Sequence, residues 1–285
     1  MSTNLSTAFV TLFSERVKQA YQAESKLRNS VRLRTGVVGS TAKFPKVGKG
    51  TAAVRTPQTD VVPLNSSFTT STATIVDYSA AEYTDIFNQQ KVNFSEREEL
   101  VQVCAKAIGR RIDQSIIDAV DGAGTSLTVA NSLGGANTNM NTTKLREAKK
   151  KLDGKNVPPD DRYMLMHANN MAALLGETAA VSFDFNALRA LEAGMIPKYL
   201  GFNIIVIGDM DEDGLAIDGS SDRTCLAWHK DAIALAEGIG ARTEINYVAE
   251  KTSWLVNAIS AHGATSVDVE GIVEVTCRDT AAAAA

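Results

Sequence analysis

The feature that most constrains this chain is one long helical pattern between residues 93 and 124. Apolar residues recur there every three or four positions: Leu100, Val101, Cys104, Ala105, Ile108, Ile112, Ile116, Ala119 and Val120. This spacing predicts an amphipathic helix of about 26 residues, which would be about 40 Å long at 1.5 Å per residue. Because only one stripe is apolar, we expect one face to pack on a sheet or a neighbouring chain and the other to face water.

The ends of this helix carry their own signals. Ser95 and Glu98 fit a capping box at its start, and Glu96 and Glu99 add negative charge to the first turn. A Gly-Ala-Gly stretch at 122–124 favours termination of the helix. The sequence therefore predicts one helix over about 95–121.

The segments before the helix predict an arm followed by a hairpin. Residues 1–35 are basic, with helical spacing of the apolar residues near the N-terminus. Residues 36–57 contain several Gly and Pro but few large apolar residues, so this part cannot bury enough surface to fold alone. We expect an extended hairpin that projects from the body and rests on another surface. The alternation in TATIVDYSAAEYTDI predicts strands.

The part of the chain after the helix alternates between strand and helix patterns, which indicates an α+β fold. The stretches RYMLMH and GFNIIVIGDM predict buried strands, and TCLAWHKDAIALAEG predicts one or two more. Helices are predicted within NTNMNTTKLREAKKKLDG and NNMAALLGE. The final stretch, SWLVNAISAHGATSVDVEGIVEVTCRD, predicts strands again.

Charge is divided unevenly along the chain. Residues 1–55 contain ten Lys and Arg but only two acids, a net charge of +8, which leaves −12 on the remainder of a chain whose total is −4. A basic arm on an acidic body indicates either nucleic-acid binding or an arm that lies on the next copy's body. The basic residues are not interleaved with aromatics, which argues against sequence-specific nucleic-acid binding and leaves non-specific phosphate contact open.

Candidate catalytic and metal-binding residues are few. None of the three histidines has a partner at metal-ligand spacing, and no G-x-S-x-G motif occurs. We interpret the histidines as core or loop residues, and the three widely separated cysteines as reduced and buried. We therefore predict no catalytic residue, cofactor site or metal site from this set: His167, His229, His262, Cys104, Cys225 and Cys277.

Two stretches match part of a ligand-binding motif, but each also fits an ordinary loop. PKVGKGTA, starting at Pro45, lacks the Gly-Lys-Ser/Thr order of a phosphate-binding loop and has no apolar strand before it. DMDEDGLAIDGS matches the opening of a calcium loop at Asp209, Asp211 and Asp213, but Ser220 stands where a bidentate Glu is required. We expect a solvated acidic turn there, and cation binding by the three aspartates stays open.

The order of three longer segments resembles the major capsid proteins of tailed bacteriophages. The first is YTDIFNQQKVNFSEREELVQVCAKAIGRRIDQSIIDAV, where this family places a strand leading into its spine helix. The second is PPDDRYMLMHANNMAALLGE, similar to the turn, strand and short helix that open the family's axial domain. The third is ALEAGMIPKYLGFNIIVIGDM, which resembles a loop leading into a core strand. AWHKDAIALAEG and GATSVDVEGIVEV look like the closing strands.

This resemblance implies a Hong Kong 97-type capsid fold in four parts. These would be an N-terminal arm at 1–35, an extended loop at 36–75, a peripheral domain at 76–124 and 255–280, and an axial domain at 125–254. The long helix would be the spine of the peripheral domain. The hairpin would lie across the adjacent subunit, with its basic residues meeting acids at the start of that subunit's spine helix. The candidates for this contact are Lys43, Lys46, Lys49, Arg55, Glu96, Glu98 and Glu99.

The resemblance also implies a structural role and not an enzymatic one. The subunit would form the hexamers and pentamers of an icosahedral or prolate phage head around double-stranded DNA, assembled in the bacterial cytoplasm. Expected partners are further copies of itself, a portal, and DNA through non-specific contact; decoration proteins stay open. Because Met1 stands directly at the arm, we expect a separate scaffolding protein. No membrane partner is expected, since no apolar run approaches about 18 residues.

Two other classes of protein were considered. An encapsulin-type nanocompartment shell shares the fold but holds cargo enzymes, and it is the alternative reading of the function. An α/β enzyme would require convergent titratable residues in a pocket. Covalent cross-linking between a loop lysine (Lys43, Lys46 or Lys49) and an asparagine such as Asn257, known in part of the family, is not predicted here.

Overall fold

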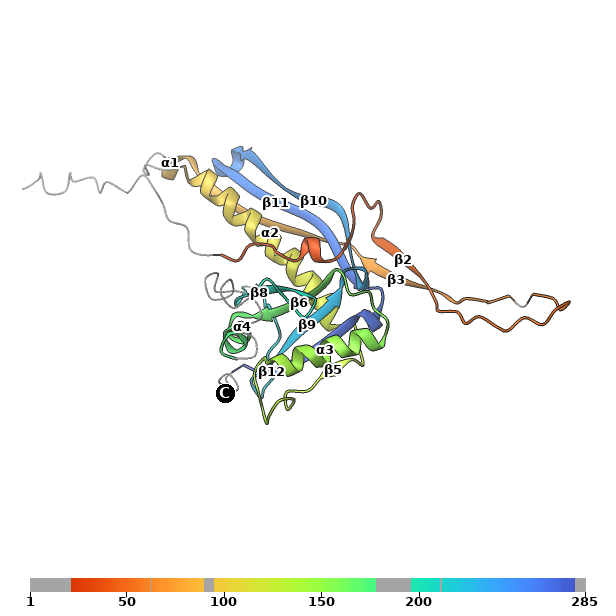
Figure 1. Cartoon of the computed structure of the whole chain (residues 1–285). Coiled ribbons are helices and arrows are strands. Elements are labelled where there is room, and N and C mark those ends of the chain that lie inside the picture. The colour runs from red at the N-terminus through yellow and green to blue at the C-terminus, as the bar shows by residue number, and fades with distance from the viewer. Residues whose placement is uncertain (1–21, 62, 90–94, 178–195, 211, 280–285) are drawn as a thin grey trace, which may run out of the picture.

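The computed structural model describes residues 22–61, 63–89, 95–177, 196–210 and 212–279. They form two β-sheets, a long helix that packs against both, and a two-stranded hairpin that projects far beyond the body (Figure 1). The expected mixed α+β architecture is confirmed.

The first sheet has four strands and lies against the long helix α2 (Glu96–Asp121). Its two longest strands pair antiparallel over most of their length, and the first strand pairs parallel at one edge. The strands in spatial order are β1 (Arg32–Arg34), β10 (Ile233–Val248), β11 (Ser253–Ser266) and β4 (Val76–Asp85). A short helix, α1 (Ile86–Gln89), follows β4.

The long helix is confirmed as a single element, and its buried stripe includes Cys104, Ile108, Ile112, Ile116 and Val120. The predicted capping box is not formed, because the Ser95 side chain accepts no hydrogen bond from the first turn. A capping box needs a particular serine rotamer as well as the right residue types. The three acids of the first turn are present as expected and complement the helix dipole.

The second sheet has six strands and mixed direction. The strands in spatial order are β5 (Thr128–Val129), β12 (Ile272–Arg278), β9 (Asp222–His229), β6 (Arg162–His167), β8 (Phe202–Ile207) and β7 (Lys198–Tyr199). Two helices accompany this sheet, α3 (Thr142–Gly154) and α4 (Ala168–Leu175), and both begin at the caps Asn141 and His167. The two helices and the strands β6, β8, β9 and β12 were predicted from their apolar patterns, whereas the two-residue strands β5 and β7 were not.

The remaining elements of the described residues are the projecting hairpin and four single turns. The hairpin pairs β2 (Thr41–Val47) with β3 (Phe68–Thr74) in antiparallel register. The turns are 3₁₀ helices: η2 (Arg28–Ser30), η4 (Lys230–Ala232), η5 (Ala249–Lys251) and η6 (Val269–Gly271). Among the described residues, no helix is both long enough and apolar enough to cross a membrane.

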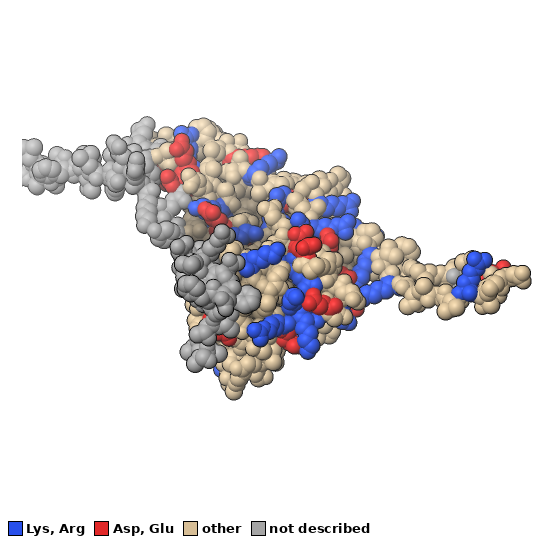
Figure 2. Space-filling model, in the orientation of Figure 1, with Lys and Arg blue, Asp and Glu red and all other residues tan. Residues whose placement is uncertain are grey.

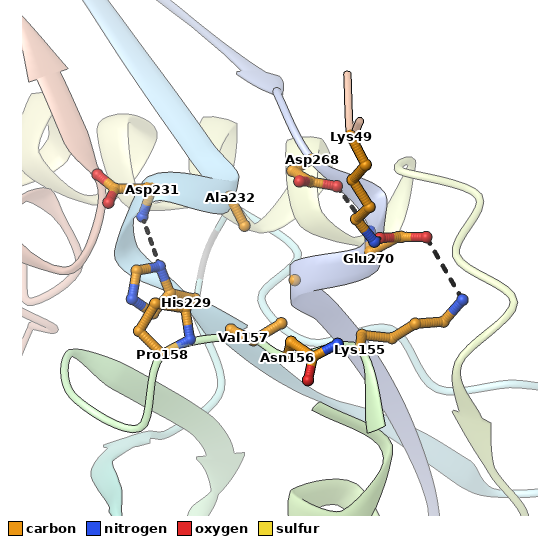
Figure 3. Close-up of a pocket in the computed structure, with 11 residues that line it drawn as sticks. Lys49, Lys155, Asn156, Val157, Pro158, His229, Asp231, Ala232, Asp268 and Glu270 are labelled. Atoms are coloured by element: carbon orange, nitrogen blue, oxygen red, sulfur yellow. Dashed lines mark hydrogen bonds and ion pairs between the residues drawn. The ribbon is translucent and has the colours of Figure 1, made fainter. Parts of the chain in front are cut away.

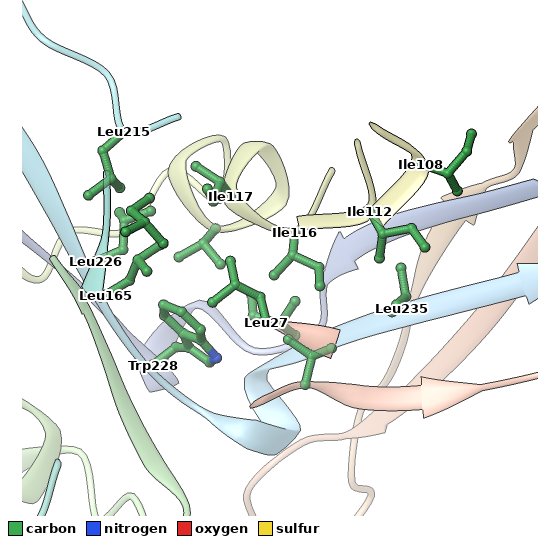
Figure 4. Close-up of a cluster of buried hydrophobic side chains, with 14 of the residues drawn as sticks. Leu27, Ile108, Ile112, Ile116, Ile117, Leu165, Leu215, Leu226, Trp228 and Leu235 are labelled. Carbon is green, nitrogen blue, oxygen red and sulfur yellow. The ribbon is translucent and has the colours of Figure 1, made fainter. Parts of the chain in front are cut away.

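One hydrophobic cluster joins the two sheets under α2 (Figure 4). Trp228 comes from the six-stranded sheet, Leu235 from the four-stranded sheet and Ile116 from the helix, and all three are fully buried. Leu27, from the segment before β1, completes this cluster and is also fully buried. Burial of one such side chain stabilises the fold by about 1.5–3 kcal/mol.

The strands of the two sheets are not divided along the chain in the same way as the domain ranges expected from the sequence. β10 falls inside the expected axial range of 125–254, yet it pairs with β11 in the four-stranded sheet. β12 falls inside the expected peripheral range of 255–280, yet it pairs with β9 in the six-stranded sheet. The reason is that β10 and β11 form one long hairpin, whose two strands cannot belong to different sheets.

Candidate functional site at the base of the projecting hairpin

Most of the hairpin has no support from the rest of the chain. We call residues 50–61 and 63–66 the distal hairpin; its only backbone hydrogen bond among these residues closes a turn at Thr56, and the bond between Gly48 and Ser67 stands at its lower end. Val54 is completely exposed, and Phe68 at the end of β3 is 76% exposed. Figure 2 shows this limb as mostly uncharged, with one small group of charged side chains near its end. Exposed apolar surface of this kind is typical of a contact with another molecule.

The base of the hairpin is packed firmly on the four-stranded sheet. Ala42, Phe44 and Ala73 form a small buried cluster with Ala234 and Ala236 of β10. The alternating pattern of β2, with every second residue buried, produces this packing. The hairpin is therefore fixed at one end and unsupported at the other.

Ion pairs hold one side of this base (Figure 3). Lys46 Nζ lies 2.7 Å from Asp268 Oδ1, and Lys49 donates to Glu270. Lys155, which follows α3, reaches the other oxygen of Glu270 at 3.4 Å. The hydrogen bond from Lys49, together with that from Lys155, lowers the pKa of Glu270. Each of these pairs is exposed enough to be screened by solvent and contributes little alone.

A cavity of about 250 Å³ lies behind these ion pairs, between the base of the hairpin, the loop after α3 and the turns η4 and η6. Its lining mixes both charges with apolar carbons: Lys49, Lys155, Val157, His229, Asp231 and Glu270. Nδ1 of His229 accepts a hydrogen bond from the backbone N–H of Asp231 at 3.2 Å, so this imidazole caps η4. The arrangement fixes the direction in which the hairpin leaves the body.

The described part of the N-terminal arm is attached to its own chain. Asp113 of α2 is almost fully buried and accepts three hydrogen bonds: from Ser25 Oγ at 2.8 Å, from the backbone of Lys26 at 2.7 Å and from the backbone of Leu27 at 3.1 Å. Burial raises the pKa of Asp113, while these hydrogen bonds act in the opposite direction. This carboxylate is therefore a fixed anchor for the arm.

Two further contacts continue the attachment. Arg28 binds Glu237 of β10 with two hydrogen bonds, of 2.7 and 2.8 Å, and the indole N–H of Trp228 donates to the backbone oxygen of Ser30 at 3.0 Å. Residues 22–34 of the expected arm, 1–35, thus lie against the body of their own chain. Residues 1–21 lie outside the described part of the chain.

The predicted contact residues occupy two separate places. Lys43, Lys46, Lys49 and Arg55 lie on the hairpin, whereas Glu96, Glu98 and Glu99 lie in the first turn of α2, at the opposite end of the body (Figure 1). One chain does not bring the two groups together. The contact was predicted between subunits, so it stays a prediction.

The residues interpreted as non-catalytic have structural partners. His167 caps α4, accepting from the backbone N–H of Asn169, and its Nε2 lies 3.2 Å from Asp209 Oδ1. Burial lowers the pKa of His167, and the nearby Arg223 lowers it further. His262 is fully buried, and its ring nitrogens lie 3.2 Å from Ser115 Oγ and 3.0 Å from Ser260 Oγ.

The other predictions about possible ligands have simple outcomes. The three cysteines are free and buried, as expected. Lys49 lies in the exposed hairpin, and no helix follows it, which does not fit a phosphate-binding loop. In the acidic turn, Asp211 lies outside the described residues. The described residues contain no group of three or more His, Cys, Asp or Glu side chains able to hold a metal ion.

Several residues that position the hairpin and the arm were missed by sequence reasoning: Asp113, Glu237, Gly263, Asp268 and Glu270. Asp113 gave a usable signal, because it is the one acid on the buried side of the long helix. A charge at such a position is expected to have a buried partner. The others depend on contacts between distant parts of the chain.

Comparison with known proteins assigns the chain to a class. A family model described as phage capsid protein matches residues 5–279, and the chain therefore belongs to the phage capsid protein family. It is a phage capsid protein, a structural protein of the virion. No curated protein sequence matches it.

Solved structures share the fold at low sequence identity. The capsid structure of cyanophage P-SCSP1u matches with a TM-score of 0.76 at 17% identity, covering 97% of this chain and 95% of that chain. A structure from Mycobacterium phage Che8 matches with a TM-score of 0.70 at 19% identity, covering 93% and 95%. The head structure of Helicobacter pylori bacteriophage KHP40 matches with a TM-score of 0.74 at 11% identity, covering 94% and 95%.

Proposed function

We propose that this capsid protein assembles with copies of itself into the hexamers and pentamers of an icosahedral or prolate head that encloses double-stranded DNA. The observation that carries the proposal is the projecting hairpin, which is fixed at its base and exposes apolar side chains along an unsupported limb. Such a limb has too little apolar burial within its own chain to be stable there. A neighbouring subunit supplies the missing surface.

The hairpin lies across the adjacent subunit in this proposal. Lys46 and Lys49 have acidic partners in their own chain, so their role is to aim the hairpin. Lys43 and Arg55 are then the basic residues directed to the neighbour, with Glu96, Glu98 and Glu99 of its α2 as their partners. Each exposed ion pair adds about 0.2–1 kcal/mol. Apolar burial at about 25 cal/mol per Å² is the larger contribution.

The two sheets correspond to the two domains of a Hong Kong 97-type subunit in this proposal. The four-stranded sheet with α2 is the peripheral domain, and the six-stranded sheet with α3 and α4 is the axial domain. With the strand pairing taken into account, β10 belongs to the former and β12 to the latter. The hairpin is the extended loop.

The remaining partners follow from the same role. DNA is contacted through its phosphates without sequence preference, and a separate scaffolding protein and a portal complete the assembly in the bacterial cytoplasm. The subunit acts as a structural element and not as an enzyme, and it uses no cofactor.

The test is to shorten the limb while keeping its base. Residues 51–64 are replaced by a short Gly-Ser linker, so that Lys49 and the β2–β3 pairing remain. We expect the shortened chain to unfold with the same midpoint as the parent chain but to form no particles visible by negative-stain electron microscopy. Particles of normal diameter from the shortened chain would overturn the proposal. If the shortened chain unfolds without cooperativity, the single change Val54→Asp gives the same test, because Val54 has no contact to lose in its own chain.

The contents of the particles separate the two kinds of shell. Particles isolated from infected cells are treated with nuclease and then extracted. Protected double-stranded DNA supports the phage head, whereas a small shell that contains an enzyme and no genome supports the nanocompartment alternative.

A further inference from the structure

The outer edge of β10 is open over most of its length. β1 pairs with β10 only at residues 234–236, and β1 ends at Arg34. Beyond this point, Ile239 to Val248 pair with β11 on one side, and no described strand lies on the other (Figure 1). Half of the backbone N–H and C=O groups in this stretch point away from β11 and are available to another strand.

This edge has the features of a strand that pairs with a strand of another chain. Nearly every residue from Ile239 to Tyr247 is exposed, including three large apolar side chains that are each 44–48% exposed: Ile239, Ile245 and Tyr247. A long open edge of this kind invites pairing with another chain, and proteins usually block it with proline, charged side chains, β-bulges or short length. The stretch IGARTEINY contains no proline or lysine; its charges, Arg242 and Glu244, are of opposite sign, and its one irregularity lies between Ile239 and Arg242.

The charges on this edge are self-complementary. Arg242 and Glu244 are two residues apart and lie on the same face, where they form an ion pair of 3.1 Å with 59% and 45% of their side chains exposed. If a second copy pairs antiparallel with Thr243 opposite Thr243, each Arg242 stands opposite a Glu244 of the other copy. Opposite charges and paired threonines are both favourable across two strands.

We propose that the β10 edges of two subunits pair antiparallel about a two-fold axis at Thr243, joining their four-stranded sheets into one continuous sheet. The register follows from the charges. A centre at Glu244 would place two glutamates directly opposite, and a centre at Ile245 would leave Arg242 opposite Val248. The irregularity of β10 between Ile239 and Arg242 limits the regular pairing to about residues 241–245. This contact deepens the proposed shell function and rests on it.

A second β10 fits this edge better than the projecting hairpin does. Pro57 and Pro63 lie in the distal hairpin, and proline cannot donate a ladder hydrogen bond. The hairpin of the same chain leaves the body at the end opposite to the tip of β10, so it does not cover this edge (Figure 1). The hairpin of another copy is an outcome that the experiment below separates.

The first experiment places a cysteine on the proposed axis. Residues directly opposite in an antiparallel pair have Cα atoms about 4.5–5.5 Å apart, within the range that a disulfide spans. The native cysteines are buried and do not compete. We expect Thr243→Cys particles to give a covalent dimer on mild oxidation that disappears on reduction. Asn246→Cys is the matched control, because its two copies would be about 20 Å apart at about 3.4 Å per residue.

Each outcome of this experiment has a distinct meaning. Particles in which Thr243→Cys stays monomeric would overturn the β10 pairing and leave the shell function standing. A dimer from Asn246→Cys but not from Thr243→Cys would overturn the register. A cross-link that appears only when Val54→Cys is combined with Thr243→Cys would assign the edge to the hairpin. Absence of the unsubstituted chain from the particles of infected cells would overturn the shell function, and this contact with it.

The second experiment separates contacts between chains from the ion pair within one chain. Arg242→Glu and Glu244→Arg each place like charges opposite one another in a pair of identical subunits, so we expect each variant alone to lose particle formation. A mixture of the two restores opposite charges across the axis, although each chain keeps its like charges internally. Recovery of particles in the mixture supports the pairing. Recovery only in the doubly changed single chain would overturn it.

Discussion

Gly263 of β11 passes directly beneath Thr74, the last residue of β3, and a Cβ at position 263 would overlap the backbone carbonyl of Thr74. β3 packs across β11 at this point. The two backbones approach so closely that only glycine fits. This crossing sets the position from which the projecting hairpin leaves the body.

Gly263→Ala is therefore expected to push β3 away from β11. Overpacking against backbone atoms lowers the free energy of unfolding by about 1–3 kcal/mol, measured by urea denaturation. Gly208→Ala is the control, because no atom lies within 4 Å of the added methyl group and the backbone there is not left-handed. Equal stability of the two variants would contradict the crossing.

Leu27→Ala is expected to lower the free energy of unfolding by about 2–5 kcal/mol, because this side chain fills the cluster between the two sheets. Leu33→Ala is the control in the same segment, where the side chain is exposed, and we expect a change of less than about 0.5 kcal/mol. Denaturant unfolding followed by tryptophan fluorescence measures both, since Trp228 contacts this segment. Similar small losses in both variants would show that residues 22–34 do not stabilise the body.

Asp113 is expected to produce a pH dependence of unusual sign. Burial raises its pKa in the folded chain above the ordinary value near 3.8, so the folded state holds this proton more tightly than the unfolded state. The stability that Asp113 contributes is therefore complete below pH 3.8, declines as the pH rises through the folded pKa, and is constant above it. Urea denaturation between pH 3 and 8 should show the advantage of the parent chain over Asp113→Asn shrinking across that interval.

At neutral pH the same variant measures how much the hydrogen bonds to Asp113 contribute to stability. We expect Asp113→Asn to lower the free energy of unfolding by about 1–3 kcal/mol, because an amide cannot accept all three hydrogen bonds from Ser25, Lys26 and Leu27. An advantage of the parent chain that grows with pH would contradict the raised pKa.

Glu270 is expected to behave in the opposite way. Lys49 and Lys155 lower its pKa, so the contribution of this ion-pair group is present above the ordinary value near 4.5 and is lost as the pH falls through the folded pKa. Glu270→Gln should speed hydrogen exchange at the base of the hairpin about two- to fivefold at neutral pH and low salt, with less effect in high salt. Glu147→Gln is the control, because Glu147 pairs only with lysines of α3. Unchanged exchange in Glu270→Gln would show that packing alone holds the base.

The local pattern of residues was sufficient to predict the long helix and most strands. Periodic apolar residues identified α2, and the scarcity of large apolar residues in 36–57 identified a limb that cannot fold alone. Both inferences depend on residues that are neighbours in the sequence. The sheets to which β10 and β12 belong could not be predicted, because strand pairing is a long-range property and the pattern of each strand is compatible with either sheet.

The anchoring of the arm could not be predicted for a related reason. Arg28 and Glu237 are 209 residues apart, and neither charge is distinctive in the sequence. A basic segment was therefore expected to seek an acidic neighbour, whereas its acidic partners lie in its own chain. The ion pairs of Lys46 and Lys49 were missed for the same reason.

The attachment of residues 22–34 has a consequence for synthesis on the ribosome. Their partners in β9 and β10 emerge only after about 200 further residues have been translated. Residues 28–34 therefore cannot complete their packing until late in translation, and Val31 stays open to solvent until then. Contacts between residues so far apart in the sequence slow the folding of a chain. Until such contacts form, the apolar surface that they will bury is exposed and prone to aggregation. Newly made subunits are expected to need a chaperone before any of them can meet another.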